Sequence, residues 1–252
     1  MITVIVPVMN EAENLEPLLE EIDRAAKTVP ISEIIYVDDG SDDGSFEILQ
    51  SLRDRYSALR VIRHDRRAGQ SAALWTGIRA AGNTLIATLD GDGQNDPADI
   101  ALVYKAYQDA LPLYGEKVMV AGQRKKRQDS LVKRLSSRFA NKIRSGLLKD
   151  GTRDTGCALK FFRRRDYLNL PYFNHMHRFL PALMIREGAT IVHVDVSHRP
   201  RTKGASKYGT LDRLMVGMTD LLGVRWLQTR GPARVSAVEE ITETPAALKK
   251  SA

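Results

Sequence analysis

Residues 85–94, LIATLDGDGQ, join an apolar run of strand length to two carboxylates, Asp90 and Asp92, that are spaced by glycines. A strand holds such a run in extended form, and the glycines allow the chain to turn as it leaves the sheet. The acids are therefore expected at the carboxyl end of a strand, where open α/β sheets bind ligands. Carboxylates this close repel each other unless a cation lies between them, and Mg2+ commonly takes one or two carboxylates plus phosphate oxygens. A surface turn of Asp and Gly is the alternative.

The first part of the chain repeats a strand followed by a helix. Four short apolar runs are each followed by residues at helical spacing, at 4–6, 34–37, 61–62 and 85–89. We expect Pro7 to end the first strand, since proline cannot donate to a ladder, and Asp96-Pro97 to begin the fourth helix. Such units predict an α/β fold with a mainly parallel central sheet flanked by helices. Because Asp38 and Asp39 also follow a strand, both acid pairs should project into one crevice.

The rest of the chain is less regular. Strands are expected at 118–121, 158–162 and 190–196, and a helix is expected in the basic segment from Leu131. Apolar residues at helical spacing over 211–226 predict a C-terminal amphipathic helix. We expect one domain over residues 1–230 and a disordered tail over 231–252, which lacks periodicity.

Charge is unevenly distributed along this chain of 252 residues, whose formal net charge is +7. Residues 124–165 contain fifteen Lys and Arg residues but three acids, which suits binding to phosphates on nucleic acid, membrane lipid or a small substrate. A solvated basic face is the alternative. No helix-turn-helix, RNA-binding or zinc-finger spacing appears, and base-stacking aromatics are scarce, so we expect no nucleic-acid partner.

The sequence favours a cytoplasmic location. The single Cys157 excludes an internal disulfide and fits a reducing compartment. No run approaches the roughly 18 apolar residues of a spanning helix, and the amino end is strand-like rather than a signal peptide. The 211–226 stripe is compatible with packing on the sheet or with lying at a bilayer surface, with Trp226 at the interface.

Taken together, the motifs resemble those of family 2 glycosyltransferases with the GT-A (Rossmann-like) fold. Within that family the chain is similar to the dolichyl- and polyprenyl-phosphate sugar synthases, typified by dolichol-phosphate mannose synthase. The resemblance extends from about residue 2 to residue 230, with Met9 where the family commonly has Tyr. It rests on five motifs in family order: VPVMNE at 6–11, VDDGS at 37–41, DGDGQ at 90–94, DTGC at 154–157 and KGASKY at 203–208.

The resemblance implies a nucleotide-sugar half at 1–122 and an acceptor and lipid half at 123–230. Asp92 and Gln94 would ligate Mg2+ or Mn2+, and Arg124 and Arg138 would hold the phosphate of the acceptor lipid. Asp90, Asp92 and these two arginines would be the catalytic residues. The nucleotide-sugar would contact a larger set: Pro7, Met9, Glu11, Asp38, Asp39, Asp90, Arg201 and Lys207.

The activity so implied is inverting, divalent-metal-dependent sugar transfer to a dolichyl or polyprenyl phosphate. A nucleotide-sugar leaves a diphosphate whose charge grows in the transition state, and a metal with nearby cations stabilises that charge. A phosphate monoester is already a nucleophile near neutral pH, so it needs no general base. Mannose from GDP-mannose is the first expectation for the donor, followed by UDP-sugars.

Two other functions are compatible with the sequence. A family 2 enzyme acting on a glycan or protein hydroxyl would need a general base, for which Asp154 and Asp195 are candidates. A nucleotide-binding or nucleic-acid-binding module without catalysis is the other, and the presence of Asp92 and Gln94 argues against it. For the lipid-phosphate enzyme we expect peripheral association with the inner face of the membrane, directly or through an integral-membrane partner.

Overall fold

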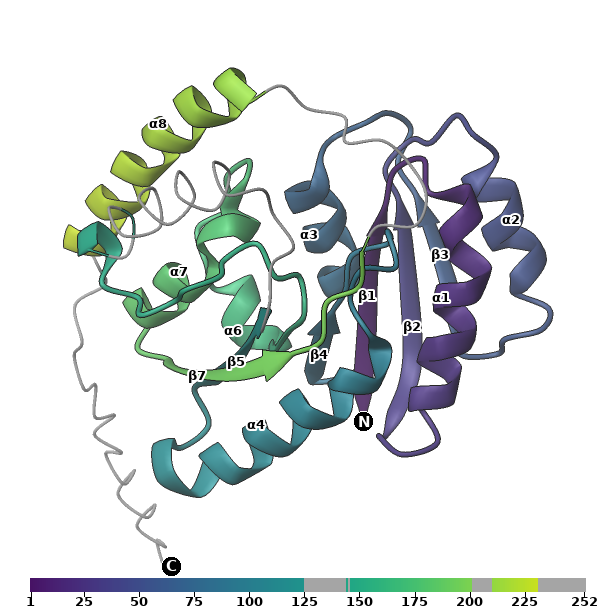
Figure 1. Ribbon diagram of the computed structural model, residues 1–252, viewed down its shortest axis with the longest axis horizontal. Coiled ribbons are helices and arrows are strands. Elements are labelled where there is room, and N and C mark those ends of the chain that lie inside the picture. The colour runs from purple at the N-terminus through teal and green to yellow at the C-terminus, as the bar shows by residue number, and fades with distance from the viewer. Residues whose placement is uncertain (125–143, 145, 201–209, 231–252) are drawn as a thin grey trace, which may run out of the picture.

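The computed structural model describes residues 1–124, 144, 146–200 and 210–230, the last of these with side chains from residue 217 on. These ranges form a sheet flanked by helices (Figure 1). The strands are β1 (Ile2–Val8), β2 (Ile31–Asp38), β3 (Leu59–Arg63), β4 (Leu85–Thr88), β5 (Val118–Arg124), β6 (Lys160–Arg163) and β7 (Thr190–Val196). The helices are α1 (Ala12–Ala25), α2 (Ser45–Leu52), α3 (Gln70–Ala80), α4 (Ile100–Tyr114), α6 (Arg164–Leu168), α7 (Leu180–Arg186) and α8 (Thr210–Thr229), with 3-10 turns η1 (Pro97–Asp99) and η2 (Met176–Phe179).

The strands of the described residues form one sheet in the order β3-β2-β1-β4-β6-β5-β7. Neighbouring strands are parallel, except that β6 runs antiparallel to both β4 and β5. The predicted α/β fold with a mainly parallel sheet is therefore confirmed. The fourth predicted helix, which consists of η1 and α4, also begins at Asp96-Pro97 as predicted. The Asp96 side chain accepts a hydrogen bond from Ala98 N at the start of η1.

Pro7 does not end β1, so that part of the sequence prediction is wrong. The strand continues to Val8, and Pro7 lies opposite Val37 in the parallel pairing with β2. On its other side, β1 pairs with β4 only from Ile2 to Ile5. The N–H that Pro7 lacks would lie beyond that ladder, so the proline is accommodated without loss of a strand hydrogen bond.

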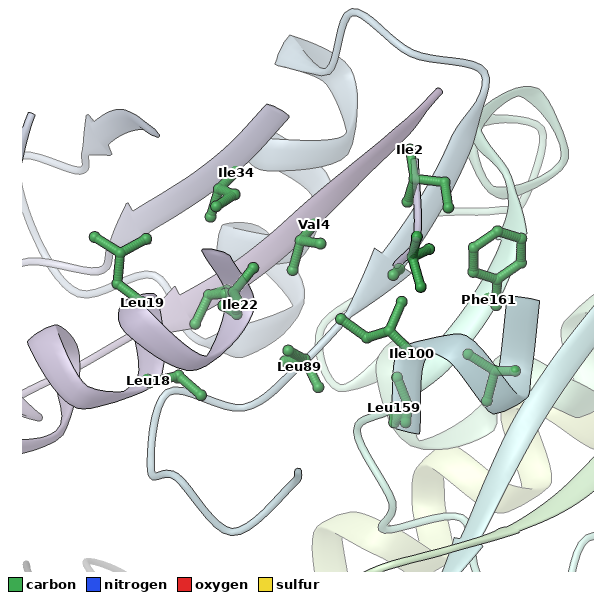
Figure 2. Packing of buried hydrophobic residues seen from close by; sticks show 14 of the residues in the cluster. Ile2, Val4, Leu18, Leu19, Ile22, Ile34, Leu89, Ile100, Leu159 and Phe161 are labelled. Carbon is green, nitrogen blue, oxygen red and sulfur yellow. The ribbon is translucent and has the colours of Figure 1, made fainter. Parts of the chain in front are cut away.

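Helices cover both faces of the sheet and enclose two hydrophobic cores. Val4 and Ile5 are adjacent on β1 and fully buried, but they belong to different cores, as the two-residue period of a strand requires. Figure 1 places α1 and α2 on one side of β1 and β2, and α3 on the other. Figure 2 shows the first core, where Val4 lies among Leu18, Leu19, Ile22, Ile34, Ile100 and Phe161. The second core packs α3, α6 and α7 onto the opposite face.

Helix α8 has two faces over the residues whose side chains are described. Val224 is fully buried, and Leu221 and Leu227 pack beside it on the second core. The opposite face carries an exposed apolar stripe with four-residue spacing, formed by Met218, Leu222 and Trp226. The helix thus packs on the protein with one face and leaves the other face free of protein contacts among the described residues.

The disordered tail predicted at 231–252 lies outside the described residues, and so does most of the helix expected from Leu131 in the basic segment. Of that helix, residues 144 and 146–148 are described, and they are helical. Within the described part of the chain, no helix is both long enough and apolar enough to cross a membrane. The 190–196 strand coincides with β7, and the 211–226 stripe falls within α8.

Candidate active site

The carboxyl ends of β2, β1 and β4 lie side by side at one edge of the sheet. These strands are adjacent and parallel, so the loops that follow them meet there. A Cβ added at Gly91 would lie 3.1 Å from both Pro7 O and Val8 Cγ2. A glycine between Asp90 and Asp92 therefore lets their loop approach the end of β1 without a tight contact to a side chain.

Asp39 positions the loop that begins α3. Its carboxylate accepts hydrogen bonds from Ala68 N at 2.8 Å and from Gly69 N at 2.7 Å. The next residue, Gln70, donates from Nε2 to Asp90 Oδ1 at 2.7 Å. The acid pair after β2 is thus connected, through this loop, to the acid pair after β4. Asp39 itself is buried, and its hydrogen bonds hold the loop at residues 68–69 in place.

Asp38 is fully buried, and its carboxylate accepts fewer hydrogen bonds than that of Asp39. Its Oδ1 accepts from Ser41 N at 3.1 Å. Its Oδ2 lies 3.3 Å from Arg63 Nε in an ion pair, yet it accepts no hydrogen bond from the described residues. An unmatched buried carboxylate oxygen marks a position where a ligand or a water completes the hydrogen bonding.

Asp90 lies where the acidic edge meets a cavity. Burial, with a contribution from the charge of Asp92, raises the pKa of Asp90 to about 7. The positive charges of Lys160 and Arg124 oppose that rise. A cation beside this acid pair would reduce the repulsion between the two carboxylates.

Asp92 and Gln94 present oxygen atoms that suit Mg2+ or Mn2+. Asp92 Oδ1 accepts from Gln94 N at 3.1 Å, which closes a short turn. The other carboxylate oxygen and the Gln94 amide oxygen have no hydrogen-bond donor among the described residues. A carboxylate oxygen and a neutral amide oxygen are ligand types that hard divalent cations prefer. The residues therefore fit the predicted cation, whose remaining ligands would be water or diphosphate oxygens.

The segment after β7 is held against this turn. Arg199 N donates to Gln94 O at 3.0 Å, and the Arg199 guanidinium forms ion pairs with Asp96 at 2.7 Å and with Glu21 at 2.8 Å. Arg199 therefore lies directly beside the candidate metal ligands.

A cavity of about 330 Å3 opens beside Asp90. The DTGC motif contributes residues 155–157 to its wall, so this motif and Asp90 share one space. Its apolar lining comes from Leu74, Leu89, Ala158, Tyr167 and Leu180, and its other polar residues are Gln70, Thr88, Lys160, His177 and Arg178. This volume lies at the lower end of the range for small-molecule sites.

Arg124, at the end of β5, is held by Asp154 of the DTGC motif. Arg124 Nε lies 2.5 Å from Asp154 Oδ2, and Nη2 lies 2.6 Å from Oδ1. Burial opposes the charged form, but these hydrogen bonds raise the pKa of Arg124 above its usual value. A Cβ at Gly156 would lie 2.9 Å from Arg124 Nη2, so the glycine lets the guanidinium lie directly behind the cavity wall.

Neither predicted general base is well placed. Both Asp154 oxygens accept hydrogen bonds from Arg124. Asp195 has a half-exposed side chain 3.8 Å from Arg153 Nη2 and does not line the cavity.

The other predicted site residues divide by position. Met9 and Glu11 follow β1 at the acidic edge, where Glu11 Oε2 accepts from Asn14 Nδ2 at 2.8 Å. Three predicted phosphate contacts lie outside the described residues: Arg138, Arg201 and Lys207. The structure thus brings together the residues predicted in the first half and places Arg124 near them.

Comparison with known proteins gives a family. The model for glycosyl transferase family 2 matches residues 3–170. The chain belongs to that family. The dodecaprenyl-phosphate galacturonate synthase of Rhizobium johnstonii is 35% identical to it over 229 residues, which cover 88% of this chain and 66% of the relative. The undecaprenyl-phosphate 4-deoxy-4-formamido-L-arabinose transferase of Photorhabdus laumondii is 32% identical, with the same coverage. The chain thus spans about 66% of the length of these relatives.

Solved structures confirm the predicted GT-A fold of this family 2 glycosyltransferase. The mannosyl-3-phosphoglycerate synthase of Rubrobacter xylanophilus superimposes with a TM-score of 0.69 at 16% identity, covering 97% of this chain and 78% of that one. The glucosyl-3-phosphoglycerate synthase of Mycobacterium tuberculosis, solved with Mn2+, UDP and its product, gives 0.61 at 18% identity, covering 93% and 81%.

Several residues of this glycosyltransferase site were not predicted from the sequence. Lys160, Tyr167 and His177 line the cavity, but none belongs to a recognised motif. Lys160 did carry a signal, because in a strand over 158–162 it shares one face with the apolar residues Ala158 and Phe162. Tyr167 and His177 carried none, since their positions depend on how α6 and η2 pack against α3.

Proposed function

We propose that this chain transfers one sugar from a nucleotide-sugar to a polyprenyl phosphate, with inversion at the anomeric carbon. The observation that carries the proposal is the position of Asp90. It belongs to the acidic edge, where it is bonded to Gln70, and it also lines the cavity that contains Lys160 and Arg178. A donor bound at the edge would place its sugar at that cavity. Relatives named for dodecaprenyl- and undecaprenyl-phosphate products support the acceptor.

The donor would bind to the half formed by residues 1–122. Asp38, whose Oδ2 lacks a hydrogen-bond donor, would accept a hydrogen bond from the nucleoside. Asp92 and Gln94 would hold Mg2+ or Mn2+, which supplies positive charge to the donor diphosphate. Arg201 and Lys207 would approach the same diphosphate, since the chain before them is fastened to Gln94.

The acceptor phosphate would bind to the half formed by residues 123–230, with Arg124 and Arg138 as its contacts. A phosphate oxygen of the lipid attacks the anomeric carbon as the bond from that carbon to the diphosphate oxygen breaks. The electron pair of the broken bond leaves with the nucleoside diphosphate. The phosphate nucleophile is mostly dianionic near neutral pH, so no residue has to remove a proton. The absence of a need for a general base agrees with the position of Asp154, whose two carboxylate oxygens both accept hydrogen bonds from Arg124.

The relatives point to donors other than GDP-mannose. Their names give galacturonate and 4-deoxy-4-formamido-L-arabinose as the transferred sugars. We therefore place these sugar classes before mannose as donors for this chain.

Helix α8 is the proposed membrane contact. Its exposed stripe of Met218, Leu222 and Trp226 is 56%, 64% and 60% exposed, and an apolar face with a tryptophan suits the headgroup boundary of a bilayer. The enzyme would then associate peripherally with the inner face of the membrane, where its lipid substrate lies, alone or with an integral-membrane partner.

A product assay tests the function. The protein is incubated with Mg2+ or Mn2+, undecaprenyl phosphate and a panel of UDP- and GDP-sugars, and lipid-linked sugar is detected by mass spectrometry. The expected result is product with wild type and at least about a 100-fold loss with Asp92→Asn, since one metal ligand is gone. Asp109→Asn, which alters an exposed ion pair on α4, is the matched control. Near-normal turnover by Asp92→Asn contradicts the metal assignment.

A further inference from the structure

Lys160 is a buried lysine whose hydrogen bonding is incomplete. It lies on β6 with 7% of its surface exposed, and burial lowers the pKa of its ammonium group. The ammonium donates one hydrogen bond, to Cys157 O. It forms no ion pair with a carboxylate of the described residues. Since an ammonium carries three donors, two have no described partner, and a buried charge without partners is costly.

The same cavity contains a second unmatched donor. Tyr167 is fully buried and stacks on Phe162 with ring centroids 5.4 Å apart. Its hydroxyl has no hydrogen-bond partner among the described residues. Both Tyr167 and Lys160 line the cavity, and Thr88, the strand partner of Lys160, lies two residues before Asp90. Two buried donors at one cavity are the feature expected of a ligand site.

The cavity has the composition of a site for one sugar ring. Leu74, Leu89 and Leu180 supply apolar walls, and the volume of about 330 Å3 is that of a small site. Lys160 and Arg178 contribute positive charge to the lining, to which Asp90 contributes a carboxylate. A carboxylate on the ring would accept hydrogen bonds from both unmatched donors and would pair directly with the Lys160 ammonium, whereas a neutral sugar would not.

We propose that this cavity binds the sugar of a nucleotide-linked hexuronic acid, with the Lys160 ammonium and the Tyr167 hydroxyl donating to the ring carboxylate. The inference rests on the proposed function and decides between the two sugar classes named for the relatives. A galacturonate carries the carboxylate, whereas 4-deoxy-4-formamido-L-arabinose carries none. Lys160 and Tyr167 are therefore specificity-determining residues for the donor.

The first test compares UDP-galacturonic acid with UDP-galactose, which differ at one ring substituent. Wild type should use the uronate at least about 30-fold more efficiently in kcat/KM, as expected for one charge-assisted bond. Lys160→Met should remove most of that ratio, because it lowers use of the uronate much more than use of UDP-galactose. Lys105→Met, which removes an exposed lysine on α4, is the control and should keep the ratio. A wild-type ratio near one overturns the inference and leaves the proposed function intact.

A second pair of variants guards against misfolding of Lys160→Met. Tyr167→Phe and Tyr36→Phe each remove a fully buried hydroxyl that has no hydrogen-bond partner among the described residues, but Tyr36 lies on β2 outside the cavity. Tyr167→Phe should lower the uronate-to-galactose ratio about five- to tenfold, and Tyr36→Phe should leave it unchanged. Equal ratios in the two variants overturn the role of Tyr167.

Titration calorimetry of each donor in the absence of lipid tests the cavity assignment independently of the proposed function. Tighter binding of UDP-galacturonic acid than of UDP-galactose, weakened by Lys160→Met, supports the cavity assignment even if no lipid-linked product forms. Absence of product from every donor contradicts the proposed function alone. Equal binding of both donors overturns the cavity assignment even if product forms.

Discussion

Arg124 and Asp154 face each other in a buried bidentate ion pair, with Nε–Oδ2 and Nη2–Oδ1 distances of 2.5 and 2.6 Å. Their side chains are 13% and 9% exposed. The pair ties the end of β5 to the DTGC motif, and Gly156 keeps the guanidinium against the wall of the cavity. Arg124 therefore has a structural role in addition to its proposed contact with the acceptor phosphate.

These two roles can be separated by a double variant. Arg124→Met alone should lower the free energy of unfolding by about 3–5 kcal/mol, because the buried Asp154 carboxylate loses the guanidinium that neutralises its charge. Adding Asp154→Leu should restore most of that loss, since both charges are then gone. Denaturant unfolding measures both. If Arg124 contacts acceptor, the stable double variant still uses lipid phosphate poorly; recovery of activity along with stability would assign Arg124 a structural role alone.

His177 predicts an acid sensitivity. Burial lowers its pKa to about 3, below the ordinary value of about 6.5, so the unfolded chain binds the proton more tightly than the folded protein. The contribution of neutral His177 to the free energy of unfolding is complete above about pH 6.5. It is lost as pH falls, by roughly 2 kcal/mol between pH 7 and pH 5. His177→Gln should lose correspondingly less stability over this interval. Parallel stability curves for wild type and variant, measured by urea unfolding, would contradict the assignment.

The α8 stripe predicts binding to vesicles. Changing Met218, Leu222 and Trp226 together to Gln should weaken binding to anionic vesicles at least about tenfold, because three apolar side chains no longer leave water. Flotation measures the bound fraction. Leu102 and Leu113 on α4 are also exposed, so the double change of these two to Gln is the control. If the control and the stripe variant lose binding equally, α8 is not the membrane contact.

Much of the first half of the fold could be predicted from the sequence. Each strand and helix of an alternating α/β unit can be recognised from the apolar pattern of its own residues. The acids after β2 and β4 indicate the ligand-binding edge of the sheet, because the carboxyl ends of parallel strands lie at the same edge. In the structure the loop that Asp39 positions contacts Asp90 through Gln70, a connection that the sequence did not predict. The end of β1 was mispredicted because the pairing of β1 with β4 stops at Ile5. The missing N–H of Pro7 therefore removes no hydrogen bond between these strands.

The cavity could not be predicted from local pattern, because its wall depends on long-range packing. Lys160 enters it from an antiparallel strand inserted between β4 and β5. Tyr167 follows on α6, and His177 is held by a 2.8 Å contact between its Nδ1 and Ser71 Oγ of α3, 106 positions earlier in the chain. No sequence spacing connects these residues.

The most direct test of the central claim follows the phosphorus of the acceptor. Phosphorus NMR is recorded on undecaprenyl phosphate, Mg2+ and the best nucleotide-sugar before and after addition of the enzyme. The account predicts that the lipid monoester signal is replaced by a sugar phosphodiester signal, with one nucleoside diphosphate released for each diester formed. An unchanged lipid monoester, with the sugar found instead on a hydroxyl acceptor or in water, would contradict it.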